Sequence, residues 1–111
     1  MVKIGGNKTL TLQKRSVADN DIGEQVATWD AVQTLTGWLD MATGEAKYST
    51  FNRKITESTH VFITDYTPID TNIENLRAVC DGQIYDVTYI DNPMGLAYHL
   101  EIFLKSTGGK I

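Results

Sequence analysis

The chain has 111 residues, 41% hydrophobic and 22% charged, with a formal net charge of −4, a balance that suits one globular domain with a single core. The acidic balance disfavours a tight binder of nucleic acid, because affinity for phosphate comes mostly from Lys and Arg. The single cysteine, Cys80, excludes a disulfide or a cysteine-based zinc cluster within the chain, and no apolar run approaches the roughly 20 residues that span a bilayer, so we expect a cytoplasmic protein without a membrane segment.

The N-terminal part combines an arm with the first strand. Gly5 and Gly6 belong to a flexible arm over residues 1–7, and Leu10 and Leu12 alternate with polar residues in a short strand over residues 10–14. The string at residues 5–9 lacks the glycine spacing and the strand-to-helix setting of a phosphate loop. The first 15 residues contain no acid, and their basic side chains form a candidate docking arm: Lys3, Lys8, Lys14 and Arg15.

A turn and a tryptophan-containing segment follow. Residues 18–24 are rich in turn formers, and the order of their acids does not match the ligand order of an EF-hand calcium loop. Residues 26–39 predict one or two strands. We expect Trp29 and Trp38 to be anchors of the core, because each indole buries a large area.

Residues 40–58 form the longest irregular stretch. They show no alternation of polar and apolar residues, and they leave room for one short helical turn at residues 45–50. A connection of this length in a small β domain is more often functional or disordered than idle. It is therefore the first segment in which we expect function.

The second half predicts further strands. Residues 59–65 form one, and the Asp81-Gly82 pair predicts a hairpin with a two-residue type I′ turn inside residues 77–90. Residues 98–105 alternate cleanly in a last strand, and residues 106–111 are expected as a flexible tail. About six short strands with at most one helix predict a mainly β protein, a small antiparallel β-barrel over residues 8–105 with one long internal loop. Cys80 is expected as a buried packing residue in one of its strands.

Catalytic and metal-binding patterns are missing from the sequence. Nothing places a nucleophile beside a base, and His60 and His99 have no partner at ligand spacing. We therefore expect no enzyme activity, no cofactor and no metal.

From about Lys8 to Lys105 the chain resembles the head-closure proteins of long-tailed bacteriophages, also called stopper or head-tail joining proteins. The resemblance lies in the order and spacing of several pieces: an early strand, a strand that ends in Gly37-Trp38-Leu39, a long loop opened by Gly44-Glu45-Ala46, and the Asp-Gly hairpin. The residues that carry the family pattern are Trp29, Trp38, Arg77, Asp81, Gly82 and Tyr85.

The resemblance implies a structural role in the virion neck, after assembly in the host cytoplasm. Members dock as a homo-oligomeric ring beneath the portal and adaptor rings of the filled capsid, close the DNA channel and present the tail attachment surface. Packaged double-stranded DNA passes through without sequence-specific binding, which suits the six acids against one arginine over residues 65–91. Residues 40–58 correspond to the family's channel loop, with these candidates: Thr43, Gly44, Glu45, Lys47, Tyr48, Arg53 and Lys54.

Two alternatives stay open. A small OB-like nucleic-acid-binding barrel needs exposed aromatic residues among Lys and Arg, whereas Tyr85 and Tyr89 share a face with acidic neighbours. A tail-end (tail completion) protein of the same particle is the second, because small β-barrels recur there.

Overall fold

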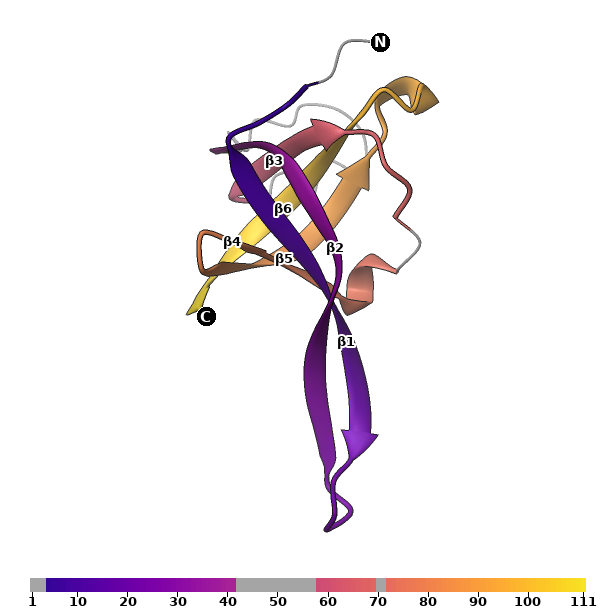
Figure 1. The fold of residues 1–111 in the computed structure, drawn as a ribbon, viewed down its shortest axis with the longest axis vertical. Coiled ribbons are helices and arrows are strands. Elements are labelled where there is room, and N and C mark those ends of the chain that lie inside the picture. Colours follow the sequence, from indigo (N-terminus) through magenta and orange to yellow (C-terminus); the bar gives the residue numbers. More distant parts are fainter. Residues whose placement is uncertain (1–3, 42–57, 70–71) are drawn as a thin grey trace.

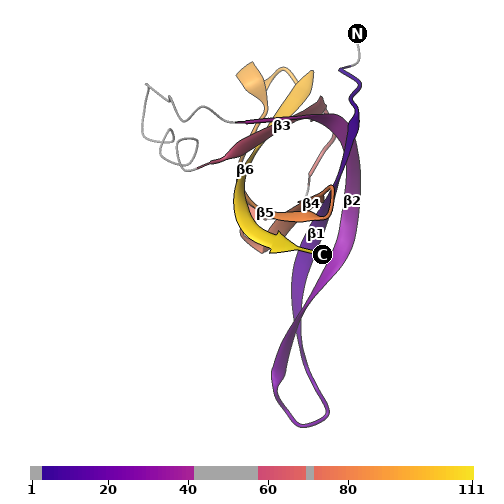
Figure 2. The same cartoon turned by 90° about the vertical axis from the view of Figure 1, so that its left-hand side faces the viewer.

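The computed structural model describes residues 4–41, 58–69 and 72–111, which form one closed barrel of six antiparallel strands (Figure 1). The strands follow each other around the barrel in the order β1-β2-β3-β6-β5-β4, and Figure 2 looks into the ring that they form. The predicted mainly β barrel is therefore confirmed. Its strands are β1 (Lys8–Asp19), β2 (Gln25–Met41), β3 (His60–Asp65), β4 (Leu76–Cys80), β5 (Gln83–Asp91) and β6 (His99–Lys110), with short 3-10 turns η1 (Ile73–Asn75) and η2 (Pro93–Gly95).

The core is built from side chains that alternate along each strand. Leu10 and Leu12 of β1 lie opposite Cys80 and Ala78 of β4, and all four side chains are buried. Cys80 is thus the packing residue that the sequence predicted. Among the described residues, the other buried apolar side chains are Leu35, Phe62, Leu76, Tyr85, Val87, Leu100, Ile102 and Leu104.

The Asp81-Gly82 turn joins β4 to β5 as predicted. Asp81 has φ of 52° and Gly82 has φ of 76°, and positive φ at both central positions is what a type I′ turn requires. Cys80 and Gln83 pair on either side of the turn.

Three strands extend further than the sequence predicted. β1 continues past Lys14 to Asp19, and β2 is a single strand of 17 residues. At the other end of the chain, the tail expected at residues 106–111 is instead the end of β6. There Lys110 pairs with Gln83, and the Ile111 amide donates to the Gly82 carbonyl at 2.8 Å.

The expectation that both tryptophans anchor the core is wrong. Trp38 is 46% exposed, and its Nε1 donates to the Ile4 carbonyl at 3.1 Å. Trp29 is partly exposed and lies against the guanidinium of Arg77. Along β2, Gly37 and Leu39 face the core, so Trp38 between them faces outward. Trp29 lies in the part of β2 that projects beyond the barrel, opposite Arg15.

The first described residues are tied to the barrel. The Ile4 amide donates to Asp65 Oδ1 at 2.7 Å, and Gly6 lies so close to the Gly37 backbone that a Cβ at Gly6 would come within 2.2 Å of the Gly37 carbonyl oxygen. Residues 4–6 of the expected flexible arm are therefore held by β2 and the end of β3, while residues 1–3 lie outside the described part.

Beyond the barrel, β1 and β2 continue together as a two-stranded hairpin that projects from it (Figures 1 and 2). It gives the molecule a long dimension of 50 Å against 30 and 25 Å. Asn20 closes the tip, since its side-chain Oδ1 accepts from the amides of Ile22 and Glu24 at 3.0 and 2.8 Å. In the described ranges no helix has the length and apolar character needed to cross a bilayer.

Candidate partner-binding surfaces

The predicted channel-loop residues lie between β2 and β3, outside the residues that the structure describes. The described chain stops at Met41, the last residue of β2, and resumes at Ser58, just before β3. The seven candidates from Thr43 to Lys54 therefore lie outside the described residues. Met41 and Ser58 mark the two points where this segment joins the barrel.

The family-pattern residues fall into separate places. Trp29 and Arg77 come together, with the Arg77 guanidinium carbon 4.4 Å from the indole centroid. Tyr85 is in the core, where its ring meets that of His60 edge-on at 5.1 Å. Trp38 stands apart from them, against the N-terminal segment.

The basic docking residues are likewise dispersed. Lys8 Nζ forms an ion pair with Asp81 Oδ2 at 2.5 Å, which ties the start of β1 to the β4–β5 turn. Lys14 and Arg15 lie further along β1, where it leaves the barrel, opposite Asp30 and Trp29 of β2. Lys3 lies outside the described residues. The structure thus divides these cations between the barrel and the root of the hairpin.

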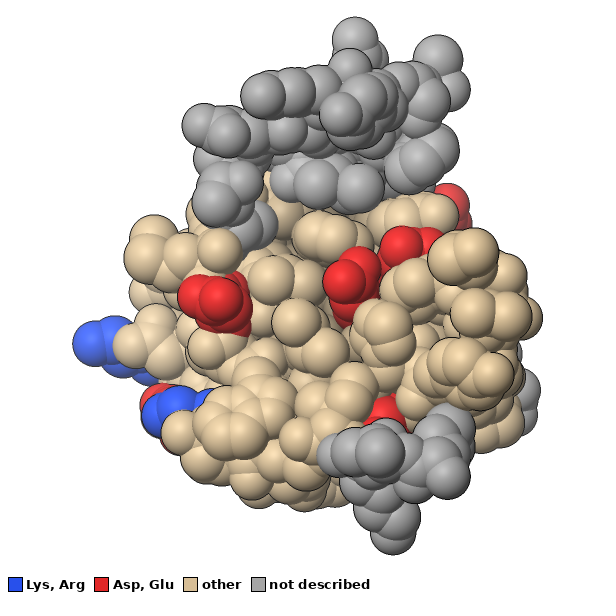
Figure 3. Space-filling model, turned by 90° about the horizontal axis from the view of Figure 1, so that it is seen from above, with Lys and Arg blue, Asp and Glu red and all other residues tan. Residues whose placement is uncertain are grey.

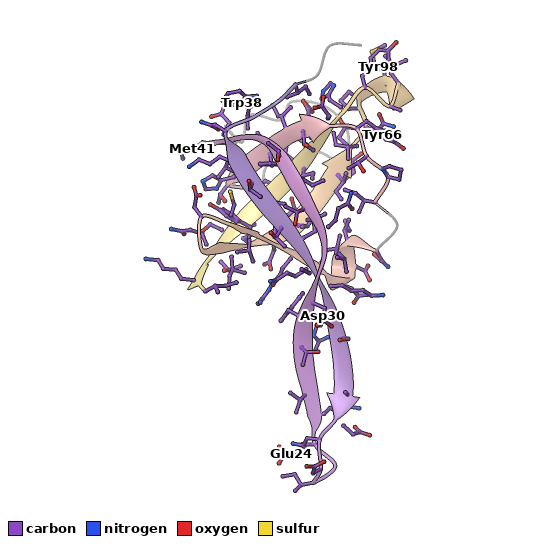
Figure 4. All side chains as sticks on the ribbon, viewed as in Figure 1. Glu24, Asp30, Trp38, Met41, Tyr66 and Tyr98 are labelled. Carbon is purple, nitrogen blue, oxygen red and sulfur yellow. The ribbon has the colours of Figure 1, made fainter. Side chains whose placement is uncertain are left out.

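The projecting hairpin is the surface that the sequence analysis missed. We define it as residues 15–30, and past Arg15 it carries four acids and no Lys or Arg: Asp19, Asp21, Glu24 and Asp30. Figure 4 shows Glu24 at its tip and Asp30 nearer the barrel. The signal in the sequence was two runs of strand-forming residues of similar length on either side of Asn20, without an apolar face.

Apolar side chains lie between these charges. Val17, Ile22 and Val26 are 48%, 77% and 42% exposed, and Val32 at the root is 48% exposed. Single exposed apolar residues are ordinary, but a narrow projection that exposes several of them beside acids has the composition of a contact surface.

Arg77 fastens the hairpin root to the barrel. Besides its stacking on Trp29, its Nε donates to Gln13 Oε1 at 2.7 Å, so one guanidinium on β4 contacts both β1 and β2 at the base of the hairpin. A cation over an indole contributes about 0.5–1 kcal/mol at an exposed site, and a hydrogen bond to a charged group contributes about 1.5–3 kcal/mol.

We expect Arg77→Met to lower the free energy of unfolding by about 2–4 kcal/mol, because methionine keeps the apolar stem and loses both guanidinium contacts. Urea denaturation followed by tryptophan fluorescence measures this. Lys110→Met removes a cation for which the described part shows no ion pair, and it should change stability by less than about 0.5 kcal/mol. Equal stability of the two variants would contradict the role given to Arg77.

The opposite end of the molecule exposes larger apolar side chains. Trp38 and Met41 lie at one side of this end and Tyr66 and Tyr98 at the other (Figure 4). Seen from this end, the uncharged surface is interrupted by a few acids, with Lys and Arg at one margin (Figure 3). On the described segments at this end, the exposed large apolar residues are Trp38, Met41, Tyr66, Met94, Leu96 and Tyr98.

Two further titratable groups, Cys80 and Tyr85, interact with the Lys8–Asp81 ion pair. The hydrogen bond that Lys8 Nζ donates to the Asp81 carboxylate raises the pKa of Lys8 above its ordinary 10.5. Burial raises the pKa of the Cys80 thiol above 9.0 and that of Tyr85 above 10.0, and the Asp81 charge adds to both shifts. Each group therefore binds its proton more tightly in the folded chain than in the unfolded one.

We expect alkaline pH to destabilise the barrel. Stability that comes from a raised pKa is complete below the unfolded value and is lost as pH rises toward the folded value, so the free energy of unfolding should fall from about pH 9 upward. Urea denaturation between about pH 8 and pH 11 measures the fall, and Cys80→Ala should make it shallower in the lower part of that range. A free energy of unfolding that stays constant across the range would contradict this reading.

The described residues offer no arrangement typical of metal binding. Within the described ranges, no three His, Cys, Asp or Glu side chains are grouped so that they could hold a metal ion. The acids at residues 19–24 belong to the hairpin tip, where Asn20 supplies the turn.

Known proteins resemble this chain in sequence pattern and in fold. A family model described as phage head completion protein matches residues 5–107. The solution structure of protein SF1141 from Shigella flexneri 2a has a TM-score of 0.68 and 17% identity, covering 99% of this chain and 100% of that chain. A chain in the virion of native gene transfer agent (GTA) particle has a TM-score of 0.56 and 14% identity, covering 88% of this chain and 91% of that chain. No curated protein matches the sequence.

Proposed function

The chain belongs to the phage head completion protein family, and from this premise we propose that it joins the DNA-filled head of a tailed phage to its tail. It is a structural component of a bacteriophage virion. In our proposal it docks as a homo-oligomeric ring beneath the portal and adaptor rings, closes the DNA channel and offers the surface to which the tail attaches. The family match across residues 5–107, nearly the whole chain, carries the proposal.

The distribution of exposed groups supports a joining role. An acidic hairpin projects from one end of the molecule, and an apolar surface around Trp38 and Tyr98 lies at the other (Figure 4). A protein that sits between two assemblies needs two separate contact surfaces, and these two ends can supply them. A protein of similar fold in the virion of the gene transfer agent particle adds support.

Two further parts of the proposal rest on the family resemblance. The segment between β2 and β3, with its candidates from Thr43 to Lys54, is proposed to close the channel. The basic residues are proposed to contact the adaptor ring. For that contact we favour Lys14 and Arg15 over Lys8, because the Lys8 ammonium already pairs with Asp81.

The OB-like alternative finds less support. Tyr85 is buried in the core, and the ring of Tyr89 lies 6.3 Å from that of Phe103. Bases stack on exposed aromatic faces beside cations, and these two tyrosines do not form such a pair. The second alternative, a tail completion protein, would be part of the same particle, so an experiment must separate it from a head-tail joining protein.

The experiment is electron microscopy of particles made after deletion of this gene from its phage or prophage. We expect emptied heads beside complete, unattached tails, and restoration of joined particles when the protein is supplied in trans. Filled heads with absent or misassembled tails would move the protein to the tail. Normal particles would overturn the proposal.

A further inference from the structure

The two-stranded hairpin has unpaired backbone edges on both sides. β4 pairs with β1 only as far as Lys14, and β3 pairs with β2 only from Gly37 onward. In the described structure no strand pairs with the outer edge of β1 past Lys14, nor with that of β2 before Gly37. Along the hairpin, residues 15–30, the outward N–H and C=O groups have no strand partner in the described structure and can pair with another chain.

A ribbon of this kind is weak by itself. Two strands without a covering layer are marginally stable in water, and this hairpin exposes Val17, Ile22 and Val26 instead of burying them. A partner strand along one edge would satisfy its backbone groups and cover part of this apolar surface.

The charge of the hairpin restricts what that partner can be. Residues 16–30 contain four acids and no Lys or Arg, and no ion pair among the described residues involves these acids. An acidic strand pair favours a basic strand and repels an acidic one.

The end of β6 has the complementary properties. One edge of β6 pairs with β5 as far as Lys110. The other edge pairs with β3, and this pairing ends at His60 and Leu104. Within the described part, residues 107–110 therefore have no strand partner on the β3 side. Lys105 and Lys110 are exposed, no acid occurs over residues 102–111, and the described structure gives neither lysine an ion pair.

We propose that the hairpin of one copy lies along the end of β6 of the next copy and adds its strands to that β5–β6 sheet. The contact joins two different surfaces of the same chain, so it is a head-to-tail contact, which builds a ring when the rotation between successive copies closes. The inference rests on the proposed function, because it supplies the subunit contact of the proposed ring.

A cysteine pair tests the contact directly. Val17→Cys and Ile111→Cys each add one exposed thiol without removing a hairpin acid or a β6 lysine, and Cys80 is buried. Mixed particles that carry both single variants are treated with a short bismaleimide. We expect a crosslinked dimer, and a ladder of higher species when both substitutions are in one chain. In the mixed particles each chain carries only one added thiol, and Cys80 is buried, so a crosslinked dimer joins two copies.

Charge exchange tests the reason for the contact. We expect the triple change Asp19→Lys, Asp21→Lys and Glu24→Lys to lower the copies per particle by about tenfold or more, because like charges then face each other. Lys105→Glu with Lys110→Glu should do the same, and all five changes together should restore incorporation. Circular dichroism of each variant confirms that the barrel is folded.

The outcomes separate this inference from the proposed function. Joined particles that contain the protein but give no dimer from the mixed thiols would overturn the subunit contact and leave the joining role intact. A crosslink from Val17→Cys to a different virion protein would also overturn it, in favour of a hairpin that docks on the adaptor or tail. If deletion of the gene leaves head-tail joining intact, the proposed function itself is wrong.

Discussion

Gly37→Ala is expected to lower the free energy of unfolding by about 3 kcal/mol or more. A Cβ at this position would come within 2.2 Å of the Ile63 carbonyl oxygen and 2.9 Å of Phe62 Cε2. The first atom belongs to backbone in the β2–β3 ladder and the second to a fully buried ring, so neither can yield without disturbing the barrel. Since domains of this size are stable by only about 5–15 kcal/mol, the loss is a large part of the total.

The measurement is urea denaturation of the purified variant, with Gly23→Ala as its matched control. Gly23 lies in the hairpin tip with φ of 81°, and a Cβ there would meet no atom within 4 Å. The control therefore carries only the strain of a positive φ, about 1 kcal/mol. If the two variants lose similar amounts of unfolding free energy, close packing at Gly37 is not the cause of its loss.

The core of the barrel could be predicted because its buried positions and its Asp-Gly turn depend on residues that are close in sequence. Alternation in residues 98–105 marked the buried positions of β6, and Asp81-Gly82 marked the turn, since few other pairs accept two positive φ values. These features depend on neighbours in sequence, so a single sequence displays them.

The hairpin could not be recognised in the same way. Past Lys14 neither face of β1 is buried, so the alternation that identifies a half-buried strand is missing. The prediction for Trp29 and Trp38 was wrong for a related reason. A large aromatic residue predicts burial in general, whereas Trp38 lies on the outward face of β2 and Trp29 lies where β2 projects beyond the barrel. Which side chain occupies a shared interior depends on contacts between distant strands.

The candidate sites also differ in how far the sequence could predict them. The family resemblance named Trp29 and Arg77 among six pattern residues without predicting a contact between them, and the structure places the two side chains together. The proposed subunit contact has no sequence motif, because unpaired edges on β1, β2 and β6 become visible only after the strands are paired.

Removing the hairpin should abolish head-tail joining while leaving the barrel folded. Ser16 and Thr28 are paired across β1 and β2, with their hydroxyl oxygens 3.0 Å apart, so residues 17–27 can be replaced by Asn-Gly to close a two-residue turn at this point. All the residues removed are exposed, and we expect the free energy of unfolding to change by less than about 1 kcal/mol. Joined particles should fall to the level seen without the protein, because the proposed ring loses its subunit contact.

Complementation of the gene deletion, scored by electron microscopy and infectious titre, measures this loss. The matched control keeps the full hairpin with Asp19→Asn, Asp21→Asn and Glu24→Gln, which removes charge but leaves both strand edges and the apolar side chains. It should join particles at reduced yield and with less dependence on salt, because screened charges contribute to the contact without supplying its backbone pairing. If the shortened protein complements fully, the hairpin makes no necessary contact, and the apolar end around Trp38 and Tyr98 becomes the surface on which head-tail joining depends.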